Sequence, residues 1–171
     1  MFVLGVDPGL SRCGYAVLEA GRRVGQARPV AIGVLRTSPQ QALPDRLVEL
    51  QRELRALLVE FDPAVVSVER IFFQRNVSTA VGVSQVSGIV LAEAASRGAA
   101  VVQYSPNEVK AAVTGDGAAD KVAVTAMVQS LLGLAQPPRP ADAADAAALA
   151  LCHLAHDPTG RLALAGLGGR R

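Results

Sequence analysis

The chain has 171 residues, of which 50% are hydrophobic and 19% charged, and its formal net charge is +2. This length suits one ordinary domain whose core needs neither disulfides nor a structural metal. No apolar run free of charge and glycine reaches the ~20 residues that cross a bilayer, so we expect a soluble cytoplasmic protein with no membrane contact. Cys13 and Cys152 lie far apart, without C-x-x-C spacing, and we interpret both as reduced thiols.

The first half of the chain predicts strands around one helix. Segments typical of strands lie at 2–6, 13–20 and 29–36, and the short turns between them suit an antiparallel meander. At 43–61 leucines recur every three to four residues, a spacing that predicts an amphipathic helix. A further strand follows at 64–69.

The second half predicts helices around one more strand. A long helix runs from an N-cap at Ser78 to about Ser96, and a strand follows at 99–105. Three more helices are expected at 106–113, 119–133 and 141–156. This order predicts one mixed-sheet α/β domain over residues 1–157 with helices on both faces, followed by a flexible tail at 158–171.

The helix at 78–96 is apolar on nearly every side, and several glycines and serines along it permit close approach. A helix of this kind is buried on more than one side. Either it lies in the middle of the domain, or one face packs on the sheet and the other on a second subunit. In a domain of this size we favour the second arrangement, a two-fold homodimer.

Acidic residues stand where apolar elements end or begin. Asp7 closes the first strand, Glu69 closes the fourth, and Asp142 and Asp145 lie on one face of the last helix. Convergent carboxylates repel one another and are stable together mainly when a cation lies between them. Oxygen ligands suit Mg²⁺ or Mn²⁺. The set therefore indicates a metal site.

Each acid also has a purely structural interpretation. Asp7-Pro8-Gly9 fits a plain β-turn, and Asp142 fits a helix N-cap with Asp145 in the first turn. Glu69 fits a solvent-facing strand end, although a strand of AVVSV has no structural need for it. Taken singly, the turn and the N-cap are the stronger interpretations, whereas the set of four favours the metal site.

Four motifs together resemble the RuvC family of Holliday-junction resolvases over about residues 2–157: GVDPG, VSVERIFFQRNVSTA, GDGAADK and ADAADAAALA. The resemblance implies a ribonuclease-H-like fold, a five-stranded mixed sheet in which the Asp7 strand pairs with the Glu69 strand. It also implies a homodimeric endonuclease that makes paired symmetric nicks in four-way DNA junctions during recombination and repair. The nicks would carry 5′-phosphate and 3′-hydroxyl ends, and the family's partners are the RuvA–RuvB branch-migration proteins.

By this resemblance the family's catalytic carboxylates correspond to Asp7, Glu69, Asp142 and Asp145. Two Mg²⁺ or Mn²⁺ ions per subunit would activate a water for in-line attack and stabilise the leaving 3′-oxygen. We expect Asp7 to bridge both ions, with Glu69 and Asp142 as further ligands. Asp145 would be a ligand or a base beside the ions.

DNA-binding residues are expected around this site. Phe72 is the candidate for stacking on unpaired bases, and Arg75 and Asn76 for phosphate or base-edge contacts. Lys110 and Lys121 match basic positions that the family places near the scissile phosphate. The competing interpretations are a core phenylalanine and solvated lysines. We interpret two late histidines, His153 and His156, as packing residues.

The sequence departs from the family pattern at Ser84 and Ser87, in a stretch where many relatives have the sequence G-Q-A-R-G. It departs again near Ala123, where a glutamine is common in relatives. These departures concern DNA contact and sequence preference rather than the carboxylates.

Three other functions compete with junction resolution. One is a ribonuclease-H-like nuclease that acts on structured RNA or other branched DNA. Another is an actin-like nucleotide phosphate-binding module, which normally needs two lobes, and a third is a junction-binding protein without catalysis. The complete acidic set together with Phe72 favours the junction nuclease.

Overall fold

The computed structural model describes residues 1–21, 26–71 and 77–157, and the predicted tail at 158–171 lies outside this part. The described strands are β1 Phe2–Asp7, β2 Arg12–Ala20, β3 Ala27–Arg36, β4 Val65–Glu69 and β5 Ala100–Tyr104. The described helices are α1 Leu43–Phe61, α2 Val77–Ser96, α3 Pro106–Thr114, α4 Lys121–Leu131 and α5 Ala141–His156. None of these helices has the length and hydropathy of a membrane span.

The strands form one mixed sheet in the order β3-β2-β1-β4-β5. β1, β2 and β3 pair antiparallel, with Asp7 opposite Gly14, whereas β4 runs parallel to β1 and β5 parallel to β4. The predicted antiparallel meander and the predicted pairing of the Asp7 and Glu69 strands are both confirmed. Because β1 and β4 are parallel neighbours, their carboxyl ends meet at the same edge of the sheet.

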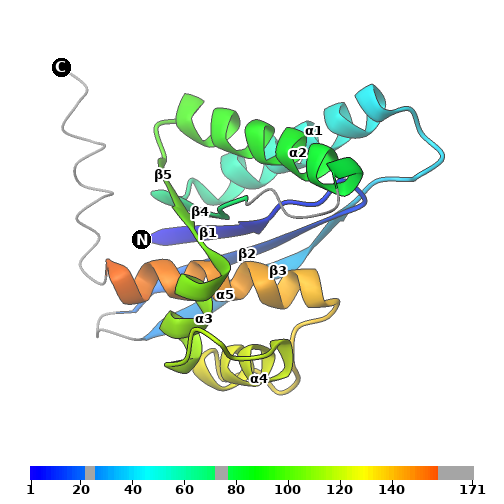
Figure 1. The fold of residues 1–171 in the computed structure, drawn as a ribbon. Helices are drawn as coiled ribbons and strands as arrows, with labels where there is room; N and C mark the ends of the chain where they lie inside the picture. Colours follow the sequence, from blue (N-terminus) through cyan, green and yellow to red (C-terminus); the bar gives the residue numbers. More distant parts are fainter. Residues whose placement is uncertain (22–25, 72–76, 158–171) are drawn as a thin grey trace.

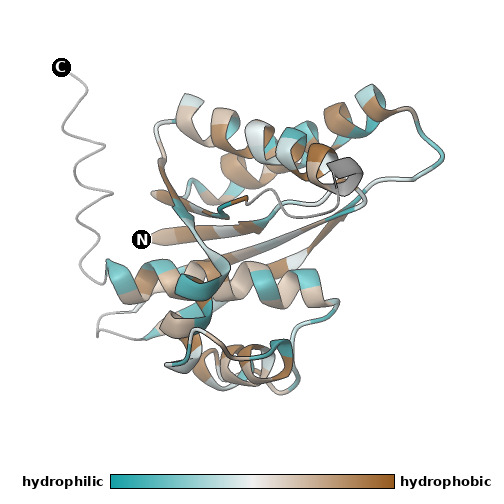
Figure 2. Ribbon diagram, in the orientation of Figure 1, coloured by the Kyte–Doolittle hydropathy of each residue, from teal (hydrophilic) through white to brown (hydrophobic). Residues whose placement is uncertain are grey.

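Helices cover both faces of the sheet, as predicted. α1 and α2 lie on one face, and α5 lies on the other with α3 and α4 outside it (Figure 1). Alternating strand residues serve the two cores. Leu4 and Val17 pack towards Leu54 of α1, whereas Val3 and Leu18 pack towards α5. Figure 2 shows hydrophobic colour along the central strands and mixed hydrophobic and polar colours on the helices that cover them.

The alanine-rich helix α5 lies unusually close to the sheet because glycines face it. A Cβ atom at Gly5 would overlap main-chain atoms of Ala146 and Ala150, and one at Gly14 would overlap the carbonyl oxygen of Asp142. Small residues on both surfaces let the two backbones approach. This packing fixes the start of α5 beside the end of β1.

The predicted boundaries lie within two residues of the observed ones, and the largest difference is at α4, predicted at 119–133 and observed at Lys121–Leu131. At α2 the difference concerns the cap. The helix begins at Val77, so Ser78 lies inside it, and the prediction of Ser78 as N-cap is wrong because the first turn has already begun. Val86 and Val90 face the core, but the side chain of Val81 is 49% exposed. The helix therefore lies in an outer layer and not in the middle of the domain.

Candidate active site

Four acidic side chains gather at the carboxyl ends of β1 and β4. Asp7 ends β1, Glu69 ends the neighbouring β4, and α5 brings Asp142 and, one turn later, Asp145. The N-cap of α5 is Pro140, so Asp142 is already inside the first turn. Its interpretation as an N-cap is therefore wrong.

Burial and mutual repulsion shape the charge of these acids. The pKa of Asp7 is raised to about 7, first by burial and then by the charges of Asp145, Glu69 and Asp142, whereas Lys121 opposes the shift. The pKa of Glu69 is also raised, first by burial and then by Asp145. Both shifts have the causes expected when carboxylates converge in a partly dry environment. Without a nearby cation, the charged forms of both Asp7 and Glu69 are therefore disfavoured.

Two cations neutralise the acids of α5. Lys121 Nζ donates a hydrogen bond to Asp145 Oδ2 at 3.0 Å, and Arg12 Nε lies 3.2 Å from Asp142 Oδ2. The hydrogen bond and charge of Asp145 raise the pKa of Lys121, which therefore stays protonated. Arg12 was not predicted, because nothing in the local sequence links the start of β2 to a helix near the C-terminus.

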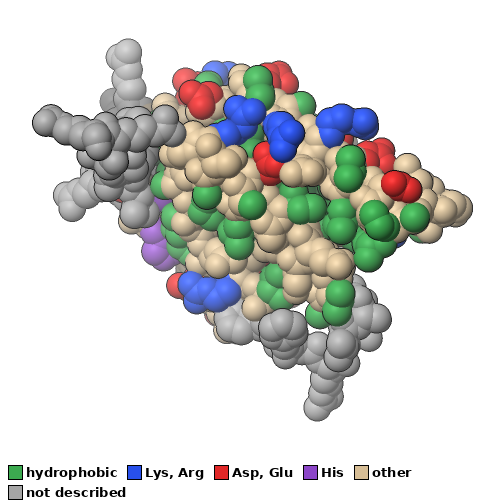
Figure 3. All heavy atoms as spheres, turned by 90° about the horizontal axis from the view of Figure 1, so that it is seen from above, with side chains coloured by type: hydrophobic (Ala, Val, Ile, Leu, Met, Phe, Trp, Pro, Cys, Tyr) green, Lys and Arg blue, Asp and Glu red, His purple; other side chains and the backbone are tan. Residues whose placement is uncertain are grey.

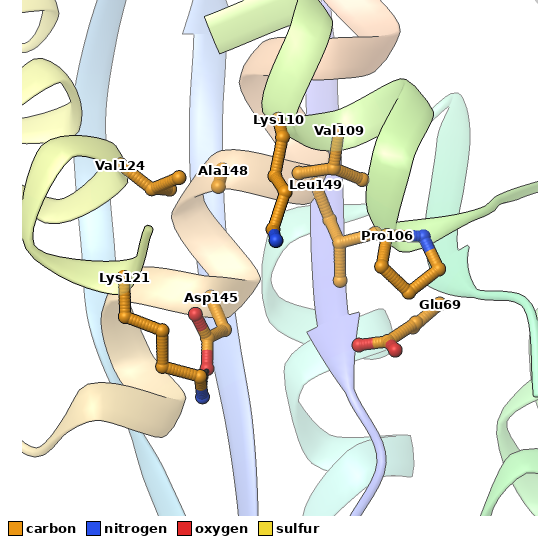
Figure 4. A pocket seen from close by; sticks show the side chains of 9 residues that line it. All are labelled: Glu69, Pro106, Val109, Lys110, Lys121, Val124, Asp145, Ala148 and Leu149. Atoms are coloured by element: carbon orange, nitrogen blue, oxygen red, sulfur yellow. Dashed lines mark hydrogen bonds and ion pairs between the residues drawn. The ribbon is translucent and has the colours of Figure 1, made fainter. Parts of the chain in front are cut away.

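A cavity of about 160 Å³ opens beside Glu69 and Asp145. Lys110 of α3 and Lys121 of α4 reach it from one side, and the Lys110 amino group points into the space between the two carboxylates (Figure 4). The remaining wall is largely apolar and includes Leu149. This cavity suits a phosphate group, because the two lysines can offset the repulsion between the phosphate and the two carboxylates.

The starts of α3 and α4 position the two lysines. Ser105 and Glu108 form a reciprocal capping box at the start of α3, and Asp120 accepts a hydrogen bond from the amide of Ala123 at the start of α4. Lys121 is therefore the first residue of its helix, two residues after the predicted start at 119. Ala123, one of the departures from the family pattern, is exposed on that helix.

The acids fit a divalent cation by their chemistry, although the ligands are not assembled. All the candidate metal ligands are carboxylate oxygens, which suit hard cations. Asp7 is partly buried, and the charges that act on it most strongly are the negative charges of the other three acids. Within residues 1–21, 26–71 and 77–157, no three Asp, Glu, His or Cys side chains stand ready to enclose an ion. Arg12 and Lys121 each approach one carboxylate oxygen, Oδ2, of Asp142 and Asp145 respectively.

Three predicted DNA-binding residues, Phe72, Arg75 and Asn76, lie outside the described residues. They follow Glu69 closely in the sequence.

The two late histidines pack against Tyr104 near the C-terminal end of α5. His153 is fully buried, with Nδ1 3.0 Å from the Tyr104 hydroxyl, and the ring of His156 packs on Tyr104. Both histidines are therefore packing residues, as predicted.

Ser87 is buried in α2, and the Ser84 hydroxyl donates to the carbonyl of Ala80. Cys13 and Cys152 are free and buried.

A five-stranded sheet of this order, with acids at the ends of its two central parallel strands and on the helix behind them, defines a ribonuclease-H-like nuclease fold. The family model described as crossover junction endodeoxyribonuclease RuvC matches residues 3–153. The chain belongs to the RuvC family.

Individual relatives agree with this assignment. Crossover junction endodeoxyribonuclease RuvC of Salinispora arenicola is 51% identical over 175 aligned positions, which cover 100% of this chain and 98% of that protein. Thermus thermophilus RuvC, solved in complex with a Holliday junction substrate, is 37% identical with a TM-score of 0.88, covering 94% of this chain and 96% of that one. The yeast mitochondrial Holliday junction resolvase Ydc2, 18% identical with a TM-score of 0.62 over 98% of this chain and 82% of that one, shares the fold.

Proposed function

We propose that this chain is a Holliday-junction resolvase, a metal-dependent endonuclease that cuts four-way DNA junctions during recombination and repair. One observation carries the proposal: a chain aligned with RuvC relatives over nearly its whole length gathers four acids at the carboxyl ends of β1 and β4. The predicted alternatives, an RNA nuclease or an actin-like module, have no comparable support.

The four acids would hold two Mg²⁺ or Mn²⁺ ions, with Asp7 as the shared ligand, Glu69 and Asp142 as further ligands, and Asp145 as a ligand or nearby base. When bound, the ions supply Lewis acidity, which lowers the pKa of an attacking water and stabilises the leaving oxygen. The carboxylates bring the negative charge that the ions neutralise. The raised pKa of Asp7, about 7, supports this role, because burial without a cation penalises its charged form.

Lys110 and Lys121 are the proposed contacts to the scissile phosphate. Their support is the cavity beside Glu69 and Asp145, into which the amino group of Lys110 points (Figure 4). A lysine ammonium binds phosphate as a compact point charge. Phe72, Arg75 and Asn76 complete the proposed DNA contacts, with Phe72 stacking on an unpaired base.

A two-fold homodimer would place two such sites on a two-fold substrate and produce paired symmetric nicks with 5′-phosphate and 3′-hydroxyl ends. The exposed side of α2 supports this assembly, because Val81 is 49% exposed on a helix of mean hydropathy well above that of α1. Figure 3 looks onto the layer of α1 and α2, where hydrophobic side chains reach the surface between charged ones. Sedimentation of the intact protein and of Val81→Glu tests it, with a monomer expected for the variant.

The remaining proposals concern the cellular setting. The RuvA–RuvB proteins are the proposed partners, and the cytoplasm is the proposed location. Residues 1–157 are proposed to form a single domain.

The direct test uses a labelled synthetic four-way junction and a linear duplex of the same sequence, each with Mg²⁺, with Mn²⁺ and with EDTA. We expect cutting of the junction alone, only with a metal, at positions related by two-fold symmetry. Equal cutting of both substrates, or cutting in EDTA, would contradict the proposed function. Cutting of a folded RNA in preference to the junction would favour the RNA nuclease.

A further inference from the structure

Three arginines gather at the end of the sheet where the acids lie, on the β2 and β3 side of Asp7. Arg12 begins β2, Arg36 ends β3, and Arg46 lies near the start of α1. The two lysines of the proposed phosphate site, by contrast, line the cavity beside Glu69, which lies on the β4 side.

Arg12 and Arg36 stand directly opposite each other in the antiparallel ladder. Like charges in this position repel and destabilise the sheet. Among the described residues, Asp142 is the only carboxylate that forms an ion pair with one of these two arginines, and its partner is Arg12. Since Asp142 is also a proposed metal ligand, the pair carries positive charge that the protein itself does not neutralise.

Arg46 is held in place by neutral groups. Its Nε donates to Thr37 Oγ1 at 2.9 Å, and its Nη2 donates to Ser11 Oγ at 2.7 Å. The hydroxyl of Thr37 in turn donates to the carbonyl of Leu10 at 2.6 Å. Among the described residues no carboxylate forms an ion pair with Arg46, Asp45 of the same turn included. The guanidinium is therefore oriented in advance, and its remaining N–H groups suit a phosphate.

A hollow of about 330 Å³ lies beside the β1–β2 turn, and Ser11, which accepts a hydrogen bond from Arg46, is part of its lining. Its lining includes Gly9, Leu10, Ser11 and Arg12 of the β1–β2 turn, Gly82 of α2 and Asp142 of α5. This volume is at the lower end of the range in which proteins hold small ligands. The hollow shares no lining residue with the cavity of Lys110 and Lys121, so the two are separate: one lies beside Arg12 and Asp142, the other beside Glu69 and Asp145.

We propose that Arg12, Arg36 and Arg46 form a second phosphate-binding strip, which holds the DNA backbone on the β2–β3 side of the scissile phosphate. The proposal rests on the proposed function, since it assigns residues to the binding of the same substrate. The nucleotide next to the scissile phosphate occupies the hollow lined by the β1–β2 turn. Its phosphate meets the guanidinium groups, while Lys110 and Lys121 meet the phosphate at the cut.

Binding of a fluorescent four-way junction in EDTA, measured by anisotropy over a series of salt concentrations, tests the strip without any catalytic readout. Arg36→Gln is the principal variant, because Arg36 is exposed and forms no ion pair in the described part of the chain. We expect affinity to fall roughly threefold to tenfold and the slope of log K against log salt to become shallower by about 0.9. Arg46→Gln should act alike, whereas Arg46→Lys should keep the slope. Arg52→Gln, an exposed arginine further along α1, is the matched control and should change neither quantity.

Unchanged affinity and slope in Arg36→Gln and Arg46→Gln would contradict the proposed phosphate-binding strip. A loss of affinity at constant slope would contradict it as well, because that result indicates an altered protein shape and not a lost phosphate contact. The unaltered protein separates this failure from failure of the proposed function. If it binds and cuts junctions while the arginine variants match it, only the strip is wrong. If it shows no preference for the junction over duplex, the proposed function fails and the strip with it.

Discussion

The main chain of Asp142 lies directly against Gly14, and Gly14 is the residue that pairs with Asp7 between β1 and β2. This contact sets how far the acids of α5 lie from the end of β1. The glycine therefore serves the active site without contributing a side chain to it.

Gly14→Ala should force α5 away from the sheet, because the new Cβ would overlap the carbonyl oxygen of Asp142. We expect a loss of about 1–3 kcal/mol in the free energy of unfolding, typical of overpacking, together with a marked fall in junction nicking. Urea unfolding followed by circular dichroism measures the first. Gly117→Ala, where a Cβ would make ordinary contacts, should change stability by less than about 0.5 kcal/mol. Equal stability of the two variants would contradict the close-packing account.

Asp7→Asn should stabilise the metal-free protein above neutral pH. The pKa of Asp7 rises from 3.8 to about 7 on folding, so the folded state binds the extra proton and loses stability as pH increases from about 4 to 7. At pH 8 the full penalty is present, and the variant removes it. We expect its melting temperature to exceed that of the unaltered protein by several degrees, since each kcal/mol is worth roughly 2–4 °C at this size.

Mg²⁺ provides the complementary measurement for Asp7. It should raise the melting temperature of the unaltered protein more than that of Asp7→Asn, because an ion stabilises the state that binds it. Asp45→Asn, an exposed acid at the start of α1, is the control and should reproduce the unaltered response to Mg²⁺. An equal Mg²⁺ response of the unaltered protein and Asp7→Asn would show that Asp7 does not hold the ion.

His153 should make the protein sensitive to acid. Burial lowers its pKa, so the unfolded chain takes up a proton near pH 6.5 that the folded protein resists, and stability falls as pH decreases below that value. Over the same pH range Asp7 has the opposite effect, because its raised pKa makes the folded protein more stable as pH decreases. The effect is therefore clearest in the Asp7→Asn background, where adding His153→Leu should flatten the dependence of unfolding free energy on pH between about 6.5 and 5. Parallel curves for the single and double variants would contradict it.

Lys121→Gln should separate stability from activity. The Lys121 side chain is 78% exposed, and an exposed ion pair of this kind contributes about 0–1 kcal/mol. We therefore expect nearly unchanged unfolding but a strong loss of nicking, because the proposed phosphate contact is removed. Arg28→Gln, which breaks an exposed pair with Glu19, should change neither property. Full nicking by Lys121→Gln would exclude a role for this lysine at the cut.

Much of the fold could be predicted because periodicity changes sharply along the chain. The leucine spacing of 43–61 matches α1 at both ends, and the pairing of the Asp7 and Glu69 strands followed from the family resemblance. The helix start at Val77 was missed, since Ser78 is a good N-cap by type and only the backbone decides where the first turn begins.

The acids and the two lysines of the site could be predicted, whereas its packing and the arginine beside Asp142 could not. Asp7 and Glu69 end strands that the sequence makes recognisable. The pairing of Arg12 with Asp142, and the close approach of Gly14 to α5, depend on elements far apart in the chain. No local pattern reports such contacts, because residue spacing encodes which face of an element is apolar and not what lies opposite it.

The most direct test of the proposed active site compares junction binding with junction nicking in Asp7→Asn. We predict that the variant binds a labelled four-way junction with an affinity close to that of the unaltered protein and that its nicking with Mg²⁺ falls below detection. Nicking at the normal rate by Asp7→Asn would contradict the account.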